Sequence, residues 1–149
     1  TENYLAKEFI PTFSFSNTSI TLANDFDAAI MEVYYLVAAQ HQEKGRLAEA
    51  AKWAEKVADL FDTPALPVSP NTSRVAGILL EAGKTEKSLR LLEGLAERVL
   101  ALYRKTSATD LILTLDHAQY YLDLIKVVLK KNNLESKKID EVIKSIENE

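Results

Sequence analysis

Two stretches of this sequence share one pattern: AAQHQEKGRLAEAAKWAEKV at residues 38–57 and AGILLEAGKTEKSLRLLEGL at residues 76–95. Their glycines, Gly45 and Gly83, are 38 residues apart, and apolar residues follow each of them at helical spacing. Corresponding residues stand seven positions before each glycine and five, nine and twelve positions after it: Ala38 and Ala76, Ala50 and Ser88, Ala54 and Leu92, Val57 and Leu95. Small residues at the first two offsets let two helices approach closely, so each stretch predicts a helical hairpin that turns at its glycine.

Helical periodicity continues on both sides of these stretches, from residue 24 to the C-terminus. Six helices are predicted: residues 24–44, 46–61, 70–82 and 85–105, one ending near 131, and a short one around 139–146. Ser69 and Pro70 have the residue types of an N-cap and a first helical position. The predicted fold is all-α: three antiparallel helical hairpins stacked as a short right-handed superhelix over residues 24–149. An irregular helical bundle is the alternative.

Residues 1–23 differ from the rest of the chain. Pro11 interrupts any helix there, and Phe13 and Phe15 lie among serines and threonines. We predict an N-terminal extended arm, over residues 1–23, that packs on the helices. The chain begins at Thr1 without an initiator methionine, so we expect it to be a piece excised from a longer protein.

The composition is that of one globular domain. The chain has 149 residues, of which 47% are hydrophobic and 27% charged, and single domains usually have about 100–200 residues. The absence of cysteine excludes disulfides, thiolate metal sites and cysteine catalysis. No stretch of about 20 mostly apolar residues is present, so no membrane span is predicted within this sequence. The formal net charge of −4 argues against nucleic acid as a partner.

No residue pattern typical of catalysis or metal binding stands out. The two histidines, His41 and His117, have no second ligand one helical turn further on, and the sequence has neither a glycine-rich phosphate loop nor a nucleophile elbow. Acidic residues mostly alternate with lysines, and we expect such helix faces, including the like-charge pair Glu93 and Glu97, to be solvated. We predict a protein that is not an enzyme and holds no metal or cofactor. A helical enzyme domain that uses carboxylates alone is the rival hypothesis.

The offsets around Gly45 and Gly83 resemble those of the tetratricopeptide repeat. That unit is a 34-residue helix–turn–helix with small residues on both sides of its glycine turn. The spacing is longer here because the Pro64–Pro70 loop is an insertion. The resemblance implies that successive hairpins stack as a superhelix, whose concave surface is lined by the first helix of each hairpin.

The sequence departs from that repeat in two places. The usual bulky aromatic near the start of the first helix is Tyr34 in one unit but Thr72 in the next. A third unit, turning at Asn132, has Lys137 where a small residue is expected. We therefore count two regular units and one degenerate unit.

The stretch from Asp27 to the C-terminus is also similar to the C-terminal repeat region of large bacterial multi-spanning membrane proteins, whose membrane part resembles protein O-mannosyltransferases. The resemblance rests on QEKG at residues 42–45, the proline-rich break, EAGKTEK at residues 81–87 and the leucine-rich helix that follows. It implies a soluble appendage without the catalytic part, tethered to a bacterial inner membrane through the parent chain.

We expect a non-catalytic scaffold that binds a protein or peptide, or docks within its own parent chain, on the concave surface. Counting from the turns places ten residues there: Glu32, Tyr35, Ala39, Gln42, Ser73, Gly77, Leu80, Gln119, Leu122 and Lys126. Of the tyrosines, Tyr34 and Tyr121 are assigned to the core. One alternative stays open for this surface: Phe13 and Phe15 fill it, and the domain is a structural spacer.

Overall fold

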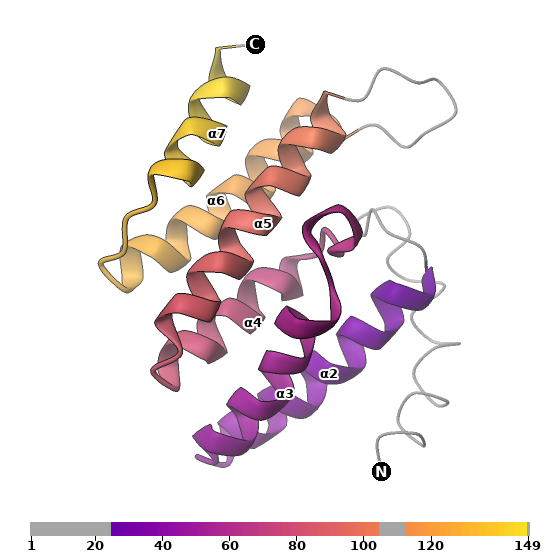
Figure 1. Ribbon diagram of the computed structural model, residues 1–149, viewed down its shortest axis with the longest axis vertical. Coiled ribbons are helices and arrows are strands. Elements are labelled where there is room, and N and C mark those ends of the chain that lie inside the picture. Colours follow the sequence, from indigo (N-terminus) through magenta and orange to yellow (C-terminus); the bar gives the residue numbers. More distant parts are fainter. Residues whose placement is uncertain (1–24, 105–112, 149) are drawn as a thin grey trace.

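The computed structural model describes residues 25–104 and 113–148, and within them the protein is all-α, without a strand (Figure 1). The expected arm, residues 1–23, lies outside the described residues. Six α-helices and one short 3-10 helix lie in the described residues: α2 (Asp25–Glu43), α3 (Leu47–Leu60), η1 (Thr63–Ala65), α4 (Pro70–Glu81), α5 (Thr85–Tyr103), α6 (Leu115–Lys131) and α7 (Lys137–Glu147).

The turns after α2, α4 and α6 have the same geometry. Gly45 and Gly83 adopt left-handed φ angles of 75° and 81°, which glycine accepts without steric cost. After α6 the left-handed residue is Asn133, with φ 54°, and not Asn132 as the sequence analysis assumed. In each turn the next amide donates to a carbonyl five residues back: Arg46 to His41, Lys84 to Leu79, and Leu134 to Leu129. This is the Schellman termination, and it occurs three times.

The start of α4 follows the sequence prediction. Ser69 is the N-cap, and its Oγ accepts a hydrogen bond from the amide of Asn71 at 3.2 Å. Pro70 occupies the first turn, where its missing amide leaves no bond unmade. The N-cap of α6 is Thr114, whose Oγ1 accepts a hydrogen bond from the amide of His117 at 3.2 Å.

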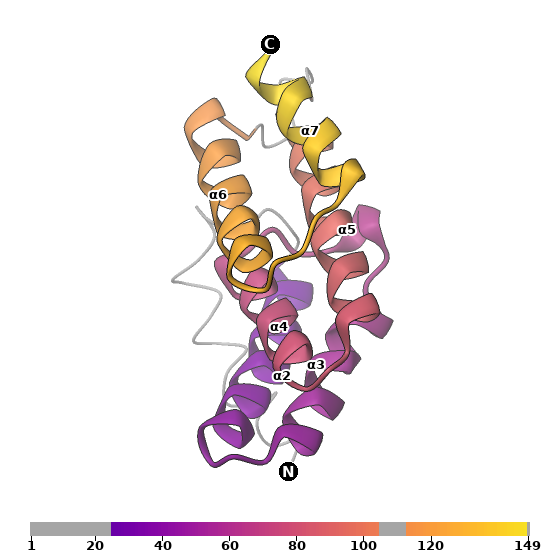
Figure 2. The same cartoon turned by 90° about the vertical axis from the view of Figure 1, so that its left-hand side faces the viewer.

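The helices form two layers. Figure 2 shows α2, α4 and α6 along one side of the molecule and α3, α5 and α7 along the other. Two side-chain hydrogen bonds join α2 to α4: Glu32 with Asn71, and Gln42 with Glu81. The two partners are 39 positions apart in the sequence in each bond, which shows that the two helices run parallel. The closest pairs are α2 with α3 and α4 with α5, whereas α7 packs mainly against α5.

The residues at the shared offsets are buried where the helices meet. Ser88, five residues after Gly83, is fully buried, and its Oγ donates to the carbonyl of Ala76, seven residues before Gly83, at 2.7 Å. The corresponding alanines of the first pair, Ala38 and Ala50, are also fully buried. The larger residues at these offsets belong to one continuous apolar core. The small residues at Ala76 and Ser88 therefore mark the place where α4 and α5 approach each other closely.

The tyrosines assigned to the core lie there. Tyr121 is 2% exposed, and burial raises the pKa of its hydroxyl. Tyr34 is half-buried against the core, with its ring 5.8 Å from that of Trp53.

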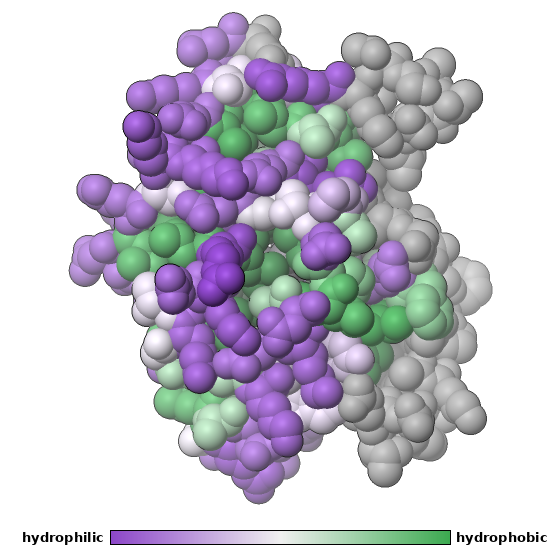
Figure 3. All heavy atoms as spheres, in the orientation of Figure 1, coloured by the Kyte–Doolittle hydropathy of each residue, from purple (hydrophilic) through white to green (hydrophobic). Residues whose placement is uncertain are grey.

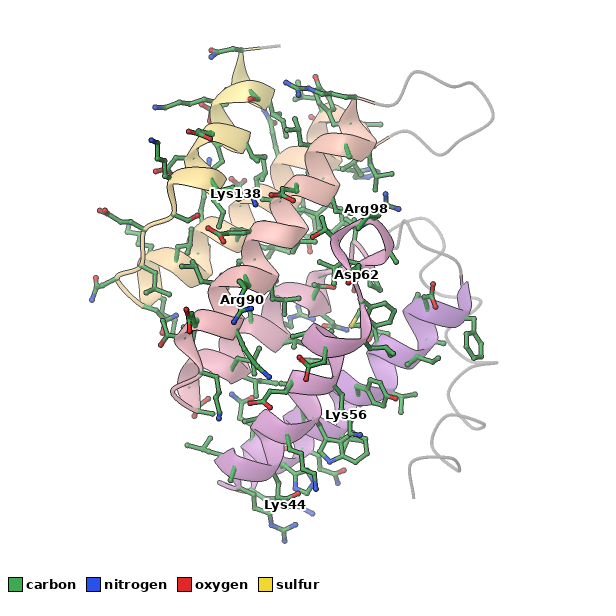
Figure 4. All side chains as sticks on the ribbon, in the orientation of Figure 1. Lys44, Lys56, Asp62, Arg90, Arg98 and Lys138 are labelled. Carbon is green, nitrogen blue, oxygen red and sulfur yellow. The ribbon has the colours of Figure 1, made fainter. Side chains whose placement is uncertain are left out.

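Helix α7 is fastened to α5 by the acidic pair that was expected to be solvated. Ser136 is the N-cap of α7, and its Oγ also donates to Glu93 Oε2 at 2.6 Å. Lys138 forms an ion pair with Glu97, and Figure 4 shows it between α7 and α5. Both glutamates are half-buried, so the expectation was wrong: they face a neighbouring helix.

None of the helices in the described residues combines the length and the apolarity that a membrane crossing requires. The face shown in Figure 3 is mostly hydrophilic, with hydrophobic residues visible between helices.

Candidate functional site

A groove of about 600 Å³ lies between α2, α4 and α6. Its lining residues come from all three helices and from the turn after α6: Tyr35, Gln42, Ser73, Arg74, Gly77, Ile78, Glu81, Leu124, Val127, Val128, Lys131 and Asn132. Four of the lining residues are aliphatic, namely Ile78, Leu124, Val127 and Val128, and charged side chains stand among the lining residues of α4 and α6. We call this hollow the groove.

The lining residues of α4 and α6 occupy equivalent positions. Four of the five lining residues of α4 have a lining counterpart on α6, at nine, six, five and two positions before the left-handed residues Gly83 and Asn133; the exception is Ser73. The equivalent pairs are Arg74 with Leu124, Gly77 with Val127, Ile78 with Val128, and Glu81 with Lys131. The same face of each helix is therefore presented to the groove.

Four of the ten residues predicted for this surface line the groove, namely Tyr35, Gln42, Ser73 and Gly77. The other six do not line it. Ala39 and Leu80 are half-buried beside it, and Glu32 and Leu122 are 5% and 3% exposed. Gln119 and Lys126 are exposed on α6, where Lys126 lies within 4 Å of Asp123 and Glu147.

One of the three errors on α6, Lys126, follows from the register of its turn; the same one-residue shift moves Gln119 and Leu122 to Tyr120 and Asp123, which do not line the groove either. Counting from Asn132 instead of Asn133 shifts every assignment by one residue, which turns a helical position by about 100°. The prediction therefore named Lys126 where Val127 lines the groove. Val127 is 63% exposed. An asparagine pair leaves either residue free to take the left-handed conformation, so the sequence alone did not fix the register.

Gly77 leaves the middle of the groove open. A Cβ built there would have no neighbouring atom within 4 Å, and the glycine has no left-handed φ angle to explain it. Glycine inside a helix destabilises it by about 1 kcal/mol relative to alanine. Neither backbone conformation nor close packing in the described structure accounts for this residue.

A buried carboxylate lies at the N-terminal end of α4. Glu32 Oε1 accepts a hydrogen bond from Ser69 Oγ at 3.1 Å, and Glu32 Oε2 accepts from Asn71 Nδ2. Asn71 Oδ1 in turn accepts from Nη1 of Arg74, which lines the groove. Burial raises the pKa of Glu32, while the hydrogen bonds from Asn71 and Ser69 and the charge of Arg74 act in the opposite direction. Glu32 therefore joins α2 to α4 beneath the groove and does not contact its interior.

The raised pKa of Glu32 predicts a pH dependence of stability. Because this pKa is higher in the folded chain than in the unfolded chain, the carboxyl stabilises the fold most below its ordinary pKa, and that contribution is lost as the pH rises through the folded value. We expect Glu32→Gln, which lacks this titration, to gain stability relative to the unchanged protein between pH 4 and pH 7. Thermal melts across this range test it. A stability difference that stays constant, or that moves the other way, contradicts the assignment.

Two smaller hollows lie elsewhere. One of about 220 Å³ lies where α3, η1 and α5 meet, with Asp59, Asp62 and Arg90 among its lining residues. Another of about 430 Å³ is lined by α3 and the end of α4. In the part of the chain that the structure describes, no three His, Cys, Asp or Glu side chains gather to hold a metal ion.

No protein-family model, curated protein or solved structure matches this chain. An account of its function therefore depends on the geometry of its own residues.

Proposed function

We propose that this protein is a non-catalytic scaffold that binds a segment of another protein, or of its own parent chain, in the groove between α2, α4 and α6. We further propose that its helix pairs stack as a short right-handed superhelix of the tetratricopeptide type. We also propose that a parent chain tethers it to a bacterial inner membrane, because its turn segments resemble those of the repeat region of large bacterial multi-spanning membrane proteins.

Three observations support the stacked arrangement. The same Schellman termination follows α2, α4 and α6. The constant 39-residue separation of two α2–α4 hydrogen bonds indicates parallel first helices. The lining positions repeat between α4 and α6 in register with the turns. A repeated unit that presents one face to a shared surface is the arrangement by which helical-repeat proteins form binding surfaces.

The main observation in favour of a binding role is that Gly77 lines the groove. Its missing side chain destabilises α4 and leaves space that no neighbouring atom uses. Around it, Val127 supplies aliphatic surface because it is largely exposed, and Leu124 and Val128 are half-buried. Hollow, partly apolar surfaces with a few polar groups are typical of sites for ligands and peptides.

A binding role fits the groove better than a catalytic one. Its one carboxylate, Glu81, accepts a hydrogen bond from Gln42 Nε2, and its lining includes no histidine. The lining residues offer contact surface and charge instead.

A peptide selection tests this proposal. The full chain is used to select binders from a random 12-residue peptide library, and the dissociation constants are measured by fluorescence anisotropy. Gly77→Trp places a large side chain in open space, so we expect a native-like melt and at least tenfold weaker binding. Leu60→Trp, at a 53% exposed position on α3, is the matched control and should bind unchanged.

Two results would overturn the proposal. One is a selection that yields no peptide, and the other is a set of peptides that bind Gly77→Trp and the unchanged protein equally well. The spacer alternative makes a separate prediction: if residues 1–23 fill the groove, their removal should create the binding that the full chain lacks.

A further inference from the structure

Arg74 is a cation in the groove, and hydrogen bonds that lead to a buried residue fix its position. Arg74 is exposed, and its Nη1 donates to Asn71 Oδ1. Asn71 donates to Glu32, which also accepts from Ser69, so the side chain of Asn71 is held on a buried group. A guanidinium group has five N–H donors in a planar fork, and Asn71 takes only one of them. Arg74 is therefore oriented while most of its donors remain available.

The other charges of the groove leave it cationic. Lys131 stands on α6, and neither it nor Arg74 lies within ion-pair distance of a carboxylate among the described residues, whereas Lys138, for example, pairs with Glu97. The single acidic residue of the lining, Glu81, accepts a hydrogen bond from Gln42 and keeps its negative charge, so two cations stand against one carboxylate in the lining, and the charge of Arg74 also acts on the buried Glu32. The chain as a whole has a net charge of −4, so this cationic surface runs against the overall charge.

Aliphatic surface adjoins these cations. Ile78 follows Arg74 by one helical turn on α4, and Leu124, Val127 and Val128 face the groove from α6. Aliphatic lining residues beside an oriented arginine suit a ligand that presents apolar side chains next to a carboxylate. Charge-assisted hydrogen bonds to arginine are strong and directional, and they gain strength when binding excludes water.

We propose that the groove recognises a protein segment in which apolar side chains are flanked by aspartate or glutamate, and that Arg74 pairs with the acidic side chain. This inference rests on the proposed function, because it names the chemistry of the segment that the groove binds. Arg74 is a specificity-determining residue here, and Glu32 and Asn71 are the residues that position it.

Parallel selections test the inference. The peptide library is selected on the unchanged protein, on Arg74→Glu and on Arg90→Glu. Arg90 lies on α5, in the other layer (Figure 4), so Arg90→Glu reverses the same charge outside the groove. We expect peptides selected on the unchanged protein and on Arg90→Glu to be enriched in acidic residues beside apolar ones. Peptides selected on Arg74→Glu should lose this enrichment and favour lysine or arginine.

A double-substitution experiment measures the contact itself. The best peptide and its Asp→Asn or Glu→Gln analogue are titrated against the unchanged protein and Arg74→Gln. The analogue should bind the unchanged protein about tenfold more weakly and should bind Arg74→Gln as well as the original peptide does.

The two proposals fail in different ways. Peptides that lose affinity for Gly77→Trp but show no acidic enrichment, or the same enrichment on Arg74→Glu, overturn this inference and leave the proposed function intact. Peptides that are insensitive to Gly77→Trp, or no peptides at all, overturn the proposed function and this inference with it.

Discussion

Leu92→Ala is expected to lower the free energy of unfolding by about 2–5 kcal/mol. Leu92 lies on α5, is fully buried and belongs to the continuous core that joins the helix pairs. Removing its side-chain carbons leaves a cavity, because close-packed surroundings relax only in part. A protein of about 150 residues loses about 2–4 °C of melting temperature per kcal/mol, so differential scanning calorimetry should show a decrease of roughly 4–20 °C.

Leu60→Ala is the matched control for this substitution. It removes the same atoms from the last residue of α3, where the side chain is 53% exposed. A surface substitution of this kind changes stability by about 0.5 kcal/mol or less. Equal decreases in the two variants would show that Leu92 is not a core residue.

Ala50→Leu should lower the melting temperature through overpacking. Ala50 stands five residues after Gly45 and is fully buried in the core where α2 and α3 pair. Forcing three additional carbons into such a site costs about 1–3 kcal/mol, which corresponds to several degrees. In a stacked arrangement the damage should spread, because each helix pair is stabilised by its neighbour. Hydrogen exchange should therefore be faster in α4 as well as in α2 and α3.

Ala48→Leu supplies the contrast, two positions earlier on α3. Ala48 is exposed, so leucine there should leave the melting temperature nearly unchanged. If both variants melt like the unchanged protein, the close approach of α2 to α3 at Ala50 is incorrect. If Ala50→Leu accelerates exchange in α2 and α3 alone, the pairs are not coupled as the stacked arrangement requires.

The sequence was most informative where a backbone requirement and a packing requirement coincide. Gly45 and Gly83 are needed for left-handed turns, and the small residues around them are needed for close approach, as the bond from Ser88 to Ala76 shows. Ser69 and Pro70 predict a helix start for an equally local reason. Such features depend on residues only a few positions apart, so a single sequence reveals them.

The groove was predictable only where those local features fixed the register. On α2 and α4, where glycine turns set the register, Tyr35, Gln42, Ser73 and Gly77 line the groove, whereas Glu32, Ala39 and Leu80, named by the same counting, do not. On α6 the asparagine pair left two choices that differ by one residue, and the residues named there do not line the groove.

Contacts between distant segments could not be predicted from local patterns. Glu32 was assigned to the surface by its offset, but Ser69 and Asn71 of the next unit draw its carboxylate into a buried hydrogen-bonded position. Glu93 and Glu97 look like a solvated pair until α7 is placed against them. In each case the partner that decides the position of the glutamate lies 37 to 43 residues away in the sequence.

The central claim is that a protein segment binds between α2, α4 and α6. The most direct test is to titrate a library-selected peptide into ¹⁵N-labelled full chain and to map the amide shift changes by NMR. The account predicts the largest changes at groove residues such as Gly77, Ile78 and Val127, with little change around Asp59 and Arg90 on the opposite layer. Changes centred on Asp59 and Arg90, with Gly77 and Val127 unaffected, would contradict it.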